Sequence, residues 1–414
     1  MLKKNTLNFG IITLFYKNYN YGGVLQAYST IYFLQSIGAR AEQIAYDQQL
    51  TIKDRICEKG CVGTLKSIIQ NTGKCLKEQT KKKKYIKSKQ FEIEKKLHTR
   101  RYKFDKFMRR VGYSGPYTNG TIKKTLSIYS GFIAGSDQIW NPKWRRSVYY
   151  LDFVPKEIPK IAYAASIGKN ILTQEEKNYI FPRIKNFQYI SVREKENQQL
   201  LKLHTDKDIK VVVDPTLLLK QEDWNEIATE SDVKDPYIFV YLLGNNKEHR
   251  AKIKQIGKKL RLKIVFLPHI HFQYEPADED FADIDLYDVG PAEFVGLIKN
   301  AVMVVTDSFH GCVFSIIYHK KFWAMKRHKD TEKENMNSRL YTLFGNLGLE
   351  DRLLDDDQQL TREELLKEID YEAVDVKLEV LRKDSMDFLE NALSESVKMI
   401  EKNQRNKGTE ALEN

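Results

Sequence analysis

The sequence predicts an α/β protein with two Rossmann-like domains, a cleft between them and a C-terminal helix that crosses back. Three observations support this fold class. The chain has 414 residues, which is too long for one ordinary core. Apolar runs of strand length alternate with amphipathic runs of helix length in two successive series. Short polar motifs follow several of the strands, at the sheet edge where open α/β sheets bind ligands.

The first series forms the predicted N-terminal domain, residues 1–218. After an opening strand, a polar loop with Asn20, Tyr21 and Gly22 leads into a helix. Backbone N–H groups at this helix start could meet an anion, and a plain tight turn is the alternative. We expect strands over 7–16, 43–46, 128–134, 148–154, 160–165, 187–192 and 209–213, and helices over 24–37, 175–185 and 195–203.

A basic helical insertion is expected at about residues 64–111 of this domain. Residues 74–110 hold 16 Lys and Arg against 4 Asp and Glu, so this segment alone accounts for the +12 net charge of the chain. Such a localised charge indicates contact with a polyanion or an anionic membrane, and a solvated helical hairpin is the alternative. No zinc-finger, RNP-like or helix-turn-helix pattern accompanies it, so we expect no nucleic acid partner.

Three strand ends of the N-terminal domain carry polar residues. Asp137 and Gln138 follow one strand and could hold sugar hydroxyls, while Trp140 could stack on a sugar face; an Asx turn with a packing Trp is the alternative. Ser166 follows the next strand. Arg193 follows a third, where its guanidinium suits a carboxylate or phosphate, unless it only pairs with a neighbouring glutamate.

The second series forms the predicted C-terminal domain, residues 219–360, after a polar crossing anchored by Trp224. Its apolar run at 301–305 predicts a buried strand that leads directly into a helix. Ser308 and His310 lie at that junction, where a helix start favours an anion and an imidazole can move a proton. A capping Ser308 and a packing His310 are the alternative. We expect strands over 237–243, 263–267 and 322–325, and helices over 247–260, 291–299 and 312–318.

Cations follow the last strand of this domain. Lys326, Arg327 and Arg339 are expected at the same mouth as His310, and a solvated basic loop is the alternative. A capping box at Thr361 opens a helical segment over 361–400, and residues 401–414 are expected to be a disordered tail.

Targeting and metal signals are missing from the sequence. The four cysteines lack metal-ligand spacing, no apolar run reaches membrane-spanning length, and the start lacks a cleavage site for a signal peptide. We therefore expect a cytoplasmic protein, at the inner face of the cell membrane if the basic segment binds lipid, without a bound metal.

Six motifs together resemble those of the polysaccharide pyruvyl transferase family, over about residues 8–350. In chain order they are Asn20-Tyr21-Gly22-Gly23, Gly135-Ser136-Asp137-Gln138-Ile139-Trp140, Ala165-Ser166-Ile167-Gly168, Ser191-Val192-Arg193-Glu194, Val213-Asp214-Pro215 and Asp307-Ser308-Phe309-His310-Gly311. The resemblance implies a GT-B-like fold and transfer of the enolpyruvyl carbons of phosphoenolpyruvate onto a sugar. The products would be a cyclic pyruvate ketal and phosphate, with no cofactor beyond this co-substrate.

The resemblance also implies roles for residues. Arg193 matches a donor-binding arginine and His310 the motif histidine. Many members have Arg two places before the histidine, where this chain has Ser308, so Lys326, Arg327 or Arg339 would supply that charge. Donor and acceptor would then meet His310, the expected general acid, and Asp137.

The implied acceptor is a hexose or hexosamine of a bacterial surface glycan, often on a lipid-linked precursor. Asn20, Tyr21, Gly22, Gln138, Trp140 and Ser166 are the residues expected around it. Two other functions stay open: a nucleotide-sugar glycosyltransferase on the same fold, and a non-catalytic glycan-binding protein.

Overall fold

The computed structural model describes residues 7–47, 87–169, 171–269, 276–332, 335–355 and 357–410. The first part of the expected basic insertion, the Lys81–Lys84 run and three of the four cysteines therefore lie outside the described residues.

The N-terminal domain is built on a seven-stranded sheet whose neighbouring strands all pair in parallel. The strand order is β3-β2-β1-β4-β5-β6-β7, so the order reverses between β1 and β4. The strands are β1 Asn8–Ile12, β2 Arg40–Tyr46, β3 Tyr113–Tyr117, β4 Gly131–Ala134, β5 Lys160–Ala165, β6 Tyr189–Val192 and β7 Ile209–Val211.

The C-terminal domain repeats this plan on a six-stranded parallel sheet, in the order β10-β9-β8-β11-β12-β13. Its order reverses between β8 and β11. Loops at the carboxyl ends of such strands bind ligands in open α/β sheets, so the topology singles out two candidate edges. The strands are β8 Tyr237–Tyr241, β9 Lys263–Phe266, β10 Ile284–Asp285, β11 Met303–Thr306, β12 Lys321–Met325 and β13 Leu353–Leu354.

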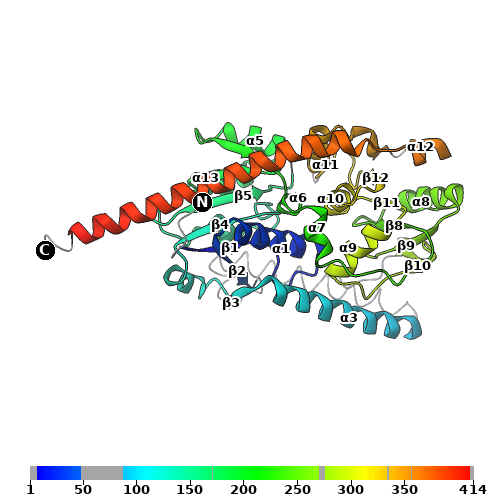
Figure 1. Ribbon diagram of the computed structural model, residues 1–414, viewed down its shortest axis with the longest axis horizontal. Helices are drawn as coiled ribbons and strands as arrows, with labels where there is room; N and C mark the ends of the chain where they lie inside the picture. Colours follow the sequence, from blue (N-terminus) through cyan, green and yellow to red (C-terminus); the bar gives the residue numbers. More distant parts are fainter. Residues whose placement is uncertain are drawn as a thin grey trace.

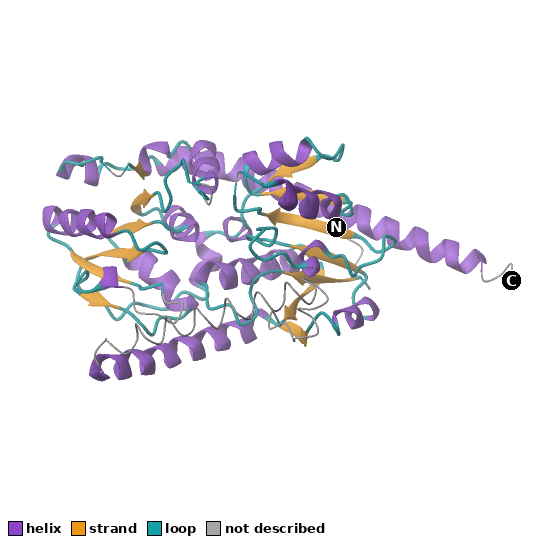
Figure 2. Ribbon diagram, turned by 180° about the vertical axis from the view of Figure 1, so that it is seen from behind, coloured by secondary structure: helices purple, strands orange, loops and turns teal. Residues whose placement is uncertain are grey.

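Helices cover both sheets, as Figure 2 shows in purple around the orange strands. Those of the N-terminal domain and the crossing are α1 Tyr21–Ser36, α3 Lys87–Val111, α4 Gln174–Ile184, α5 Lys195–Lys202, α6 Pro215–Leu218 and α7 Gln221–Asn225. The others are α8 Lys247–Leu260, α9 Pro291–Asn300, α10 Phe309–Ile317, α11 Ser338–Leu347, α12 Arg362–Leu366 and α13 Tyr371–Glu410. None of the described helices is long and apolar enough to cross a membrane.

One continuous apolar core joins the two domains. It contains buried side chains from α1 and β1, from α9, α10 and β8, and from α13. Trp224 of α7 is fully buried within it, with ring centroids 5.8 Å from Tyr28 of α1 and 4.8 Å from Phe314 of α10. The predicted crossing segment is thus packed between both domains.

The C-terminal helix crosses back, as predicted. α13 starts beside the C-terminal domain, runs over the N-terminal domain and projects past it (Figure 1). Arg382 donates from Nε to the Leu217 carbonyl at 2.5 Å, and Ser385 Oγ accepts from the Val213 N–H at 3.0 Å. The arrangement of two Rossmann-like domains with a returning helix is GT-B-like, which confirms the predicted fold class.

α3 spans the domains on the opposite edge of the molecule from α13 (Figures 1 and 2). Lys103 Nζ lies 2.8 Å from Glu293 Oε1 of α9, and Arg100 Nη1 donates to the Pro268 carbonyl at 3.0 Å. These contacts join α3 to the C-terminal domain, and its Phe107 ring lies 5.5 Å from the Tyr28 ring of α1 in the N-terminal domain. The described part of the basic insertion is therefore helical and contacts both domains.

Two local predictions are wrong. Residues 148–154 contain a 3₁₀-helix, η2 Ser147–Tyr150, in place of a strand, because a short buried apolar run does not distinguish the two. Residues 401–410, predicted to be part of a tail, continue α13. Two strands were not predicted: β3, which contains Gly115 and Pro116, and the two-residue β10.

Candidate active site at the domain junction

The carboxyl ends of strands from both sheets bring charged residues together. Asp137 follows β4, Arg193 follows β6 and Asp214 follows β7, whereas His310 lies in the first turn of α10 after β11. We call Asp137, Arg193, Glu194, Asp214 and His310 the junction cluster.

Arg193 is the centre of the junction cluster. Its side chain is 2% exposed; Nη1 donates to Asp214 Oδ2 at 2.5 Å and Nη2 to Asp137 Oδ1 at 3.3 Å. Nε lies 3.7 Å from Glu194 Oε1. The ring of Phe309 covers the guanidinium, 4.7 Å from its central carbon. Arg193 is thus clamped by carboxylates of its own domain and by an aromatic ring of the other.

Asp214 is a fully buried carboxylate with several donors. Oδ1 accepts from the backbone N–H and the hydroxyl of Thr216 at 3.0 and 2.7 Å, and Oδ2 accepts from Ser136 Oγ at 3.2 Å. Burial works against its charge, but the neighbouring His310 and Arg193, with the Thr216 hydrogen bond, hold the pKa of Asp214 well below its usual value. Asp214 is therefore ionised at neutral pH.

His310 meets this carboxylate from the other domain. Its Nε2 lies 3.7 Å from Asp214 Oδ2, which is too long for a hydrogen bond, and this buried nitrogen has no hydrogen-bond partner. The ring lies against Gly22 of α1, where an added Cβ would come 2.0 Å from Nδ1. An unpartnered, buried imidazole nitrogen beside a carboxylate is suited to proton transfer.

The contact between Gly22 and His310 brings together the starts of helices α1 and α10. Asn20 caps α1 by accepting from the Gly23 N–H at 3.2 Å, and Ser308 caps α10 by accepting from the Gly311 N–H at 3.3 Å. The predicted strand-to-helix junction at Ser308 and His310 is confirmed. The first N–H groups of a helix lack partners within it, and both dipoles favour a negative charge at this place.

Two further arginines lie near the junction cluster. Arg339, at the start of α11, donates from Nε to the Met336 carbonyl at 3.2 Å; burial, with Arg327 and Arg193, lowers the pKa of Arg339 to about 10. Arg327 donates from Nη2 to the Asp307 carbonyl at 3.2 Å, and its Nε lies 3.8 Å from Asp307 Oδ2 without a hydrogen-bond partner. A bound anion would relieve the mutual repulsion of these cations.

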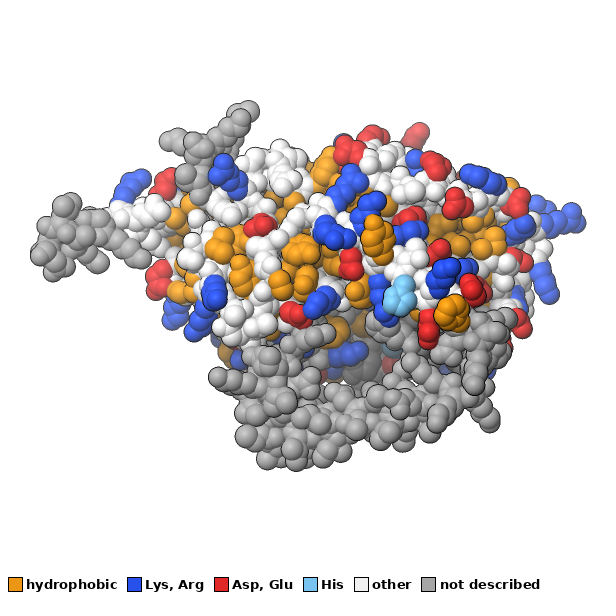
Figure 3. Space-filling model, turned by 90° about the horizontal axis from the view of Figure 1, so that it is seen from below, with side chains coloured by type: hydrophobic (Ala, Val, Ile, Leu, Met, Phe, Trp, Pro, Cys, Tyr) orange, Lys and Arg blue, Asp and Glu red, His pale blue; other side chains and the backbone are white. Residues whose placement is uncertain are grey.

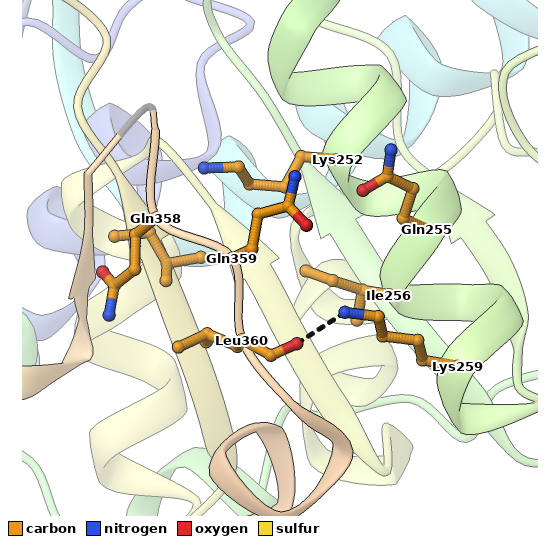
Figure 4. Close-up of a pocket in the computed structure, with 8 residues that line it drawn as sticks. Lys252, Gln255, Ile256, Lys259, Gln358, Gln359 and Leu360 are labelled. Atoms are coloured by element: carbon orange, nitrogen blue, oxygen red, sulfur yellow. Dashed lines mark hydrogen bonds between the residues drawn. The ribbon is translucent and has the colours of Figure 1, made fainter.

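A cavity of about 140 Å³ opens beside Arg193 and Arg339. Asp214 and Phe309 also line it, together with apolar residues of α11 and α13; His310 does not. This volume suits a ligand of a few carbon atoms. A smaller hollow of about 20 Å³ lies between α8 and Leu354 with residues 358–360 (Figure 4). It has room for roughly one water molecule, and no residue of the junction cluster lines it.

Two residues expected at the acceptor belong to the core. Trp140 is fully buried, donates from Nε1 to the Tyr149 carbonyl at 3.2 Å and stacks on Tyr150. Tyr21 is fully buried, stacks on Phe294 at 4.6 Å and donates to the Val289 carbonyl at 2.7 Å. The alternative of a packing Trp is therefore correct, because neither ring offers a face to a sugar.

The remaining expected residues separate into two groups. Gln138 lies half-buried at the edge of the junction cluster, with Nε2 3.6 Å from Met336 Sδ, and Ser166 donates to Glu194 Oε1 at 2.7 Å. Lys326 instead pairs with Asp330 at 3.3 Å and Asp355 at 2.9 Å, so these carboxylates already neutralise its charge.

Asp214 is a site residue that was not predicted as one, although it lies within the motif Val213-Asp214-Pro215. The usable signal was its position, since a charged residue directly after a predicted buried strand lies at the ligand-binding edge of the sheet. Its pairing with Arg193 and His310 depends on strand order and on the second domain, which local patterns do not give.

The geometry defines a two-domain α/β protein with a cationic, histidine-containing site at the domain junction. A family model described as polysaccharide pyruvyl transferase matches residues 20–329, a range that holds the whole junction cluster. The chain belongs to the polysaccharide pyruvyl transferase family, which confirms the predicted resemblance. No curated protein matches the sequence.

Several solved structures are similar to this chain. The UDP-GlcNAc 2-epimerase of Methanocaldococcus jannaschii, in complex with UDP-GlcNAc and UDP, is 14% identical, with 90% of this chain and 92% of that chain covered and a TM-score of 0.44. The UDP-GlcNAc 2-epimerase of Neisseria meningitidis is 10% identical (91% and 100% covered, TM-score 0.47), and MurG of Acinetobacter baumannii is 9% identical (96% and 100%, TM-score 0.40). Likenesses this distant imply no shared substrate.

Proposed function

We propose that this protein transfers the pyruvyl group of phosphoenolpyruvate onto a pair of sugar hydroxyls of a bacterial surface polysaccharide or its lipid-linked precursor. The observation that carries the proposal is the meeting of His310 and Arg193 at Asp214, each from a different domain and next to two more arginines. Family membership supports the same chemistry.

Donor binding calls for cations, because phosphoenolpyruvate carries both a carboxylate and a phosphate. Both Nη atoms of Arg193 are engaged by carboxylates, so Arg193 contributes mainly charge and position. Arg339, which is half-buried, and Arg327, whose Nε lies 3.8 Å from Asp307 Oδ2 but has no hydrogen-bond partner, are better placed to hold the two anionic groups. Ser308 caps α10, and these arginines would replace the charge that many family members have at that position.

His310 is the proposed general acid. It protonates the methylene carbon of the donor, which leaves an oxocarbenium-like centre at C2. One acceptor hydroxyl forms a C–O bond to C2 and loses its proton to the imidazole. The second hydroxyl forms another C–O bond as the bond from C2 to the phosphate oxygen breaks, and its proton leaves with the phosphate. The net products are a cyclic ketal and hydrogen phosphate.

Asp214 acts through His310 in this proposal. The Asp214 carboxylate lies 3.7 Å from Nε2 and is proposed to orient the imidazole toward the donor. Asp137 and Gln138, at the edge of the junction cluster, are the residues proposed to orient the acceptor, and the starts of α1 and α10 face the same region.

The experiment is phosphate release from phosphoenolpyruvate with a glycan acceptor, measured for His310→Ala and His310→Gln. We expect a loss of about 10²–10⁴-fold, as for removal of a general acid. His319→Ala is the matched control, because His319 pairs with Asp375 at 3.1 Å on the exposed surface. It should retain wild-type turnover.

Three outcomes would contradict the proposal. Wild-type turnover of both His310 variants would remove the imidazole from the reaction. Calorimetric binding of a UDP- or GDP-sugar but not of phosphoenolpyruvate to the wild-type protein would instead indicate a glycosyltransferase. A complete lack of phosphate release with every acceptor tested would leave only glycan binding.

A further inference from the structure

The outer face of α3 carries one continuous row of aromatic and basic side chains. Successive members are three or four residues apart, so they lie on one side of the helix. We call this row the α3 stripe; it consists of Phe91, Lys95, His98, Tyr102, Lys106 and Arg109.

The opposite side of α3 determines which way the stripe faces. Phe104, Phe107, Met108 and Val111 are buried in the core, and Arg100 reaches over the Tyr21 ring to the Pro268 carbonyl. The helix is therefore held against both domains by its apolar side. The stripe, half a turn away, points into solvent.

The aromatic members of the stripe are unusually exposed. Phe91 is 68% exposed and Tyr102 is 61% exposed, about 16 Å apart along the helix. Lys95, Lys106 and Arg109 are exposed beside them. Figure 3 views this side of the molecule and shows Lys and Arg side chains intermingled with hydrophobic ones where grey atoms do not cover the face. Keeping two large rings in water costs free energy, which a binding partner would recover.

Charge decides between possible partners. α3 carries ten Lys and Arg against three Asp and Glu, within the segment that accounts for the net charge of the chain. α3 is a straight helix at the edge of the molecule (Figure 1), and none of its described residues lines the cavity beside Arg193. A line of rings and cations fits an extended anionic boundary better than a compact protein partner.

We infer that the α3 stripe docks this protein on an anionic membrane surface. Phe91 and Tyr102 would enter the boundary between headgroups and acyl chains, while Lys95, Lys106 and Arg109 would contact lipid phosphates. The inference deepens the proposed function, because a protein held there would meet a lipid-linked acceptor. Only that consequence rests on the proposed function; the lipid contact does not.

The test is co-sedimentation of the full chain with vesicles of phosphatidylcholine, with or without phosphatidylglycerol. A charge variant, K95Q/K106Q/R109Q, should lose at least about tenfold in binding to the anionic vesicles. A ring variant, F91S/Y102S, should bind more weakly at low and at high salt, whereas the effect of the charge variant should fade as salt screens the charges.

The matched control removes three exposed cations elsewhere. Lys367, Lys383 and Lys398 are 65%, 74% and 68% exposed, so K367Q/K383Q/K398Q changes net charge equally and should bind as wild type. Equal losses in this control and the charge variant would mean that net charge alone matters, and would overturn the inference.

Two more results would overturn it: no wild-type binding to anionic vesicles, or unchanged binding by both stripe variants. Binding of a nucleic acid or an acidic protein by the wild-type protein, without binding to anionic vesicles, would also overturn the inference. Phosphate release with a water-soluble acceptor, measured on the same samples, separates the two ideas. A stripe variant that keeps wild-type phosphate release but loses vesicle binding supports docking. If none of the samples releases phosphate, the vesicle measurement still tests the docking.

Discussion

At the scale of single residues, His310 occupies its position because Gly22 has no side chain. The imidazole fills the space that a Cβ at Gly22 would take, and it approaches Asp214 from the other side. The position of the proposed acid therefore depends on a glycine of the opposite domain, through the close approach of two backbones. Glycine also costs helix stability in α1, which indicates that the contact outweighs local propensity.

Gly22→Ala should impair both the position of the acid and the packing around it. The added methyl group would displace the buried His310 ring, and misplacement of a catalytic group by about 1 Å can cost about 10²-fold in rate. We expect that loss in kcat for phosphate release, with a loss of about 1–3 kcal/mol in the free energy of unfolding from overpacking. Gly345→Ala in α11 is the control, because its nearest neighbour would be 3.8 Å from the new Cβ. Wild-type kcat in Gly22→Ala would show that the ring does not need this position.

At the scale of elements, α13 supports the site from a distance. Its Ser385 hydroxyl accepts from the buried N–H of Val213, the residue directly before Asp214. Arg382 donates to the carbonyls of Leu217 and Leu219 at the other end of the same loop. The crossing helix thus holds the loop that carries Asp214, and β7 alone would not fix it.

Ser385→Ala should lower the free energy of unfolding by about 1–3 kcal/mol, because it leaves the Val213 N–H buried without a partner. Ser396→Ala is a matched control: both hydroxyls bond the carbonyl four residues earlier, but only Ser385 also bonds another element. Chemical denaturation of the two variants measures the difference. Equal destabilisation by both would assign the effect to the helix and not to the loop.

Elements with a clear repeat were predictable from the sequence. The predicted helix over 247–260 matches α8, because its buried residues recur at helical spacing. The predicted strand over 160–165 matches β5, which is a short apolar run bounded by Pro159 and Gly168. η2 was not predictable as a helix. Its Val148, Tyr149 and Tyr150 are buried at successive positions, so no face contrasts with solvent and periodicity carries no information.

At the scale of the whole molecule, the two sheets share one apolar core. Side chains of α1, α10 and α13 belong to the same buried cluster, and Trp224 packs against both domains. Separating the domains would expose this core, so the arrangement differs from two independent units joined by a linker.

The protein should therefore unfold in one cooperative transition. Differential scanning calorimetry should give a single peak whose calorimetric enthalpy is close to the van't Hoff enthalpy, because neither sheet keeps its covering surface without the other. Two resolved peaks would show that the shared core contributes little to the stability of each domain.

The sequence by itself determined the two α/β series, the junction at Ser308 and His310, and the concentration of positive charge near α3, because each depends on residues close together in the chain. Tertiary structure alone decided that Arg193 pairs with Asp214, that Gly22 makes room for His310, and that Trp140 and Tyr21 enter the core. These outcomes join residues up to hundreds of positions apart. They follow from strand order and from the packing of one domain on the other, which no local pattern encodes.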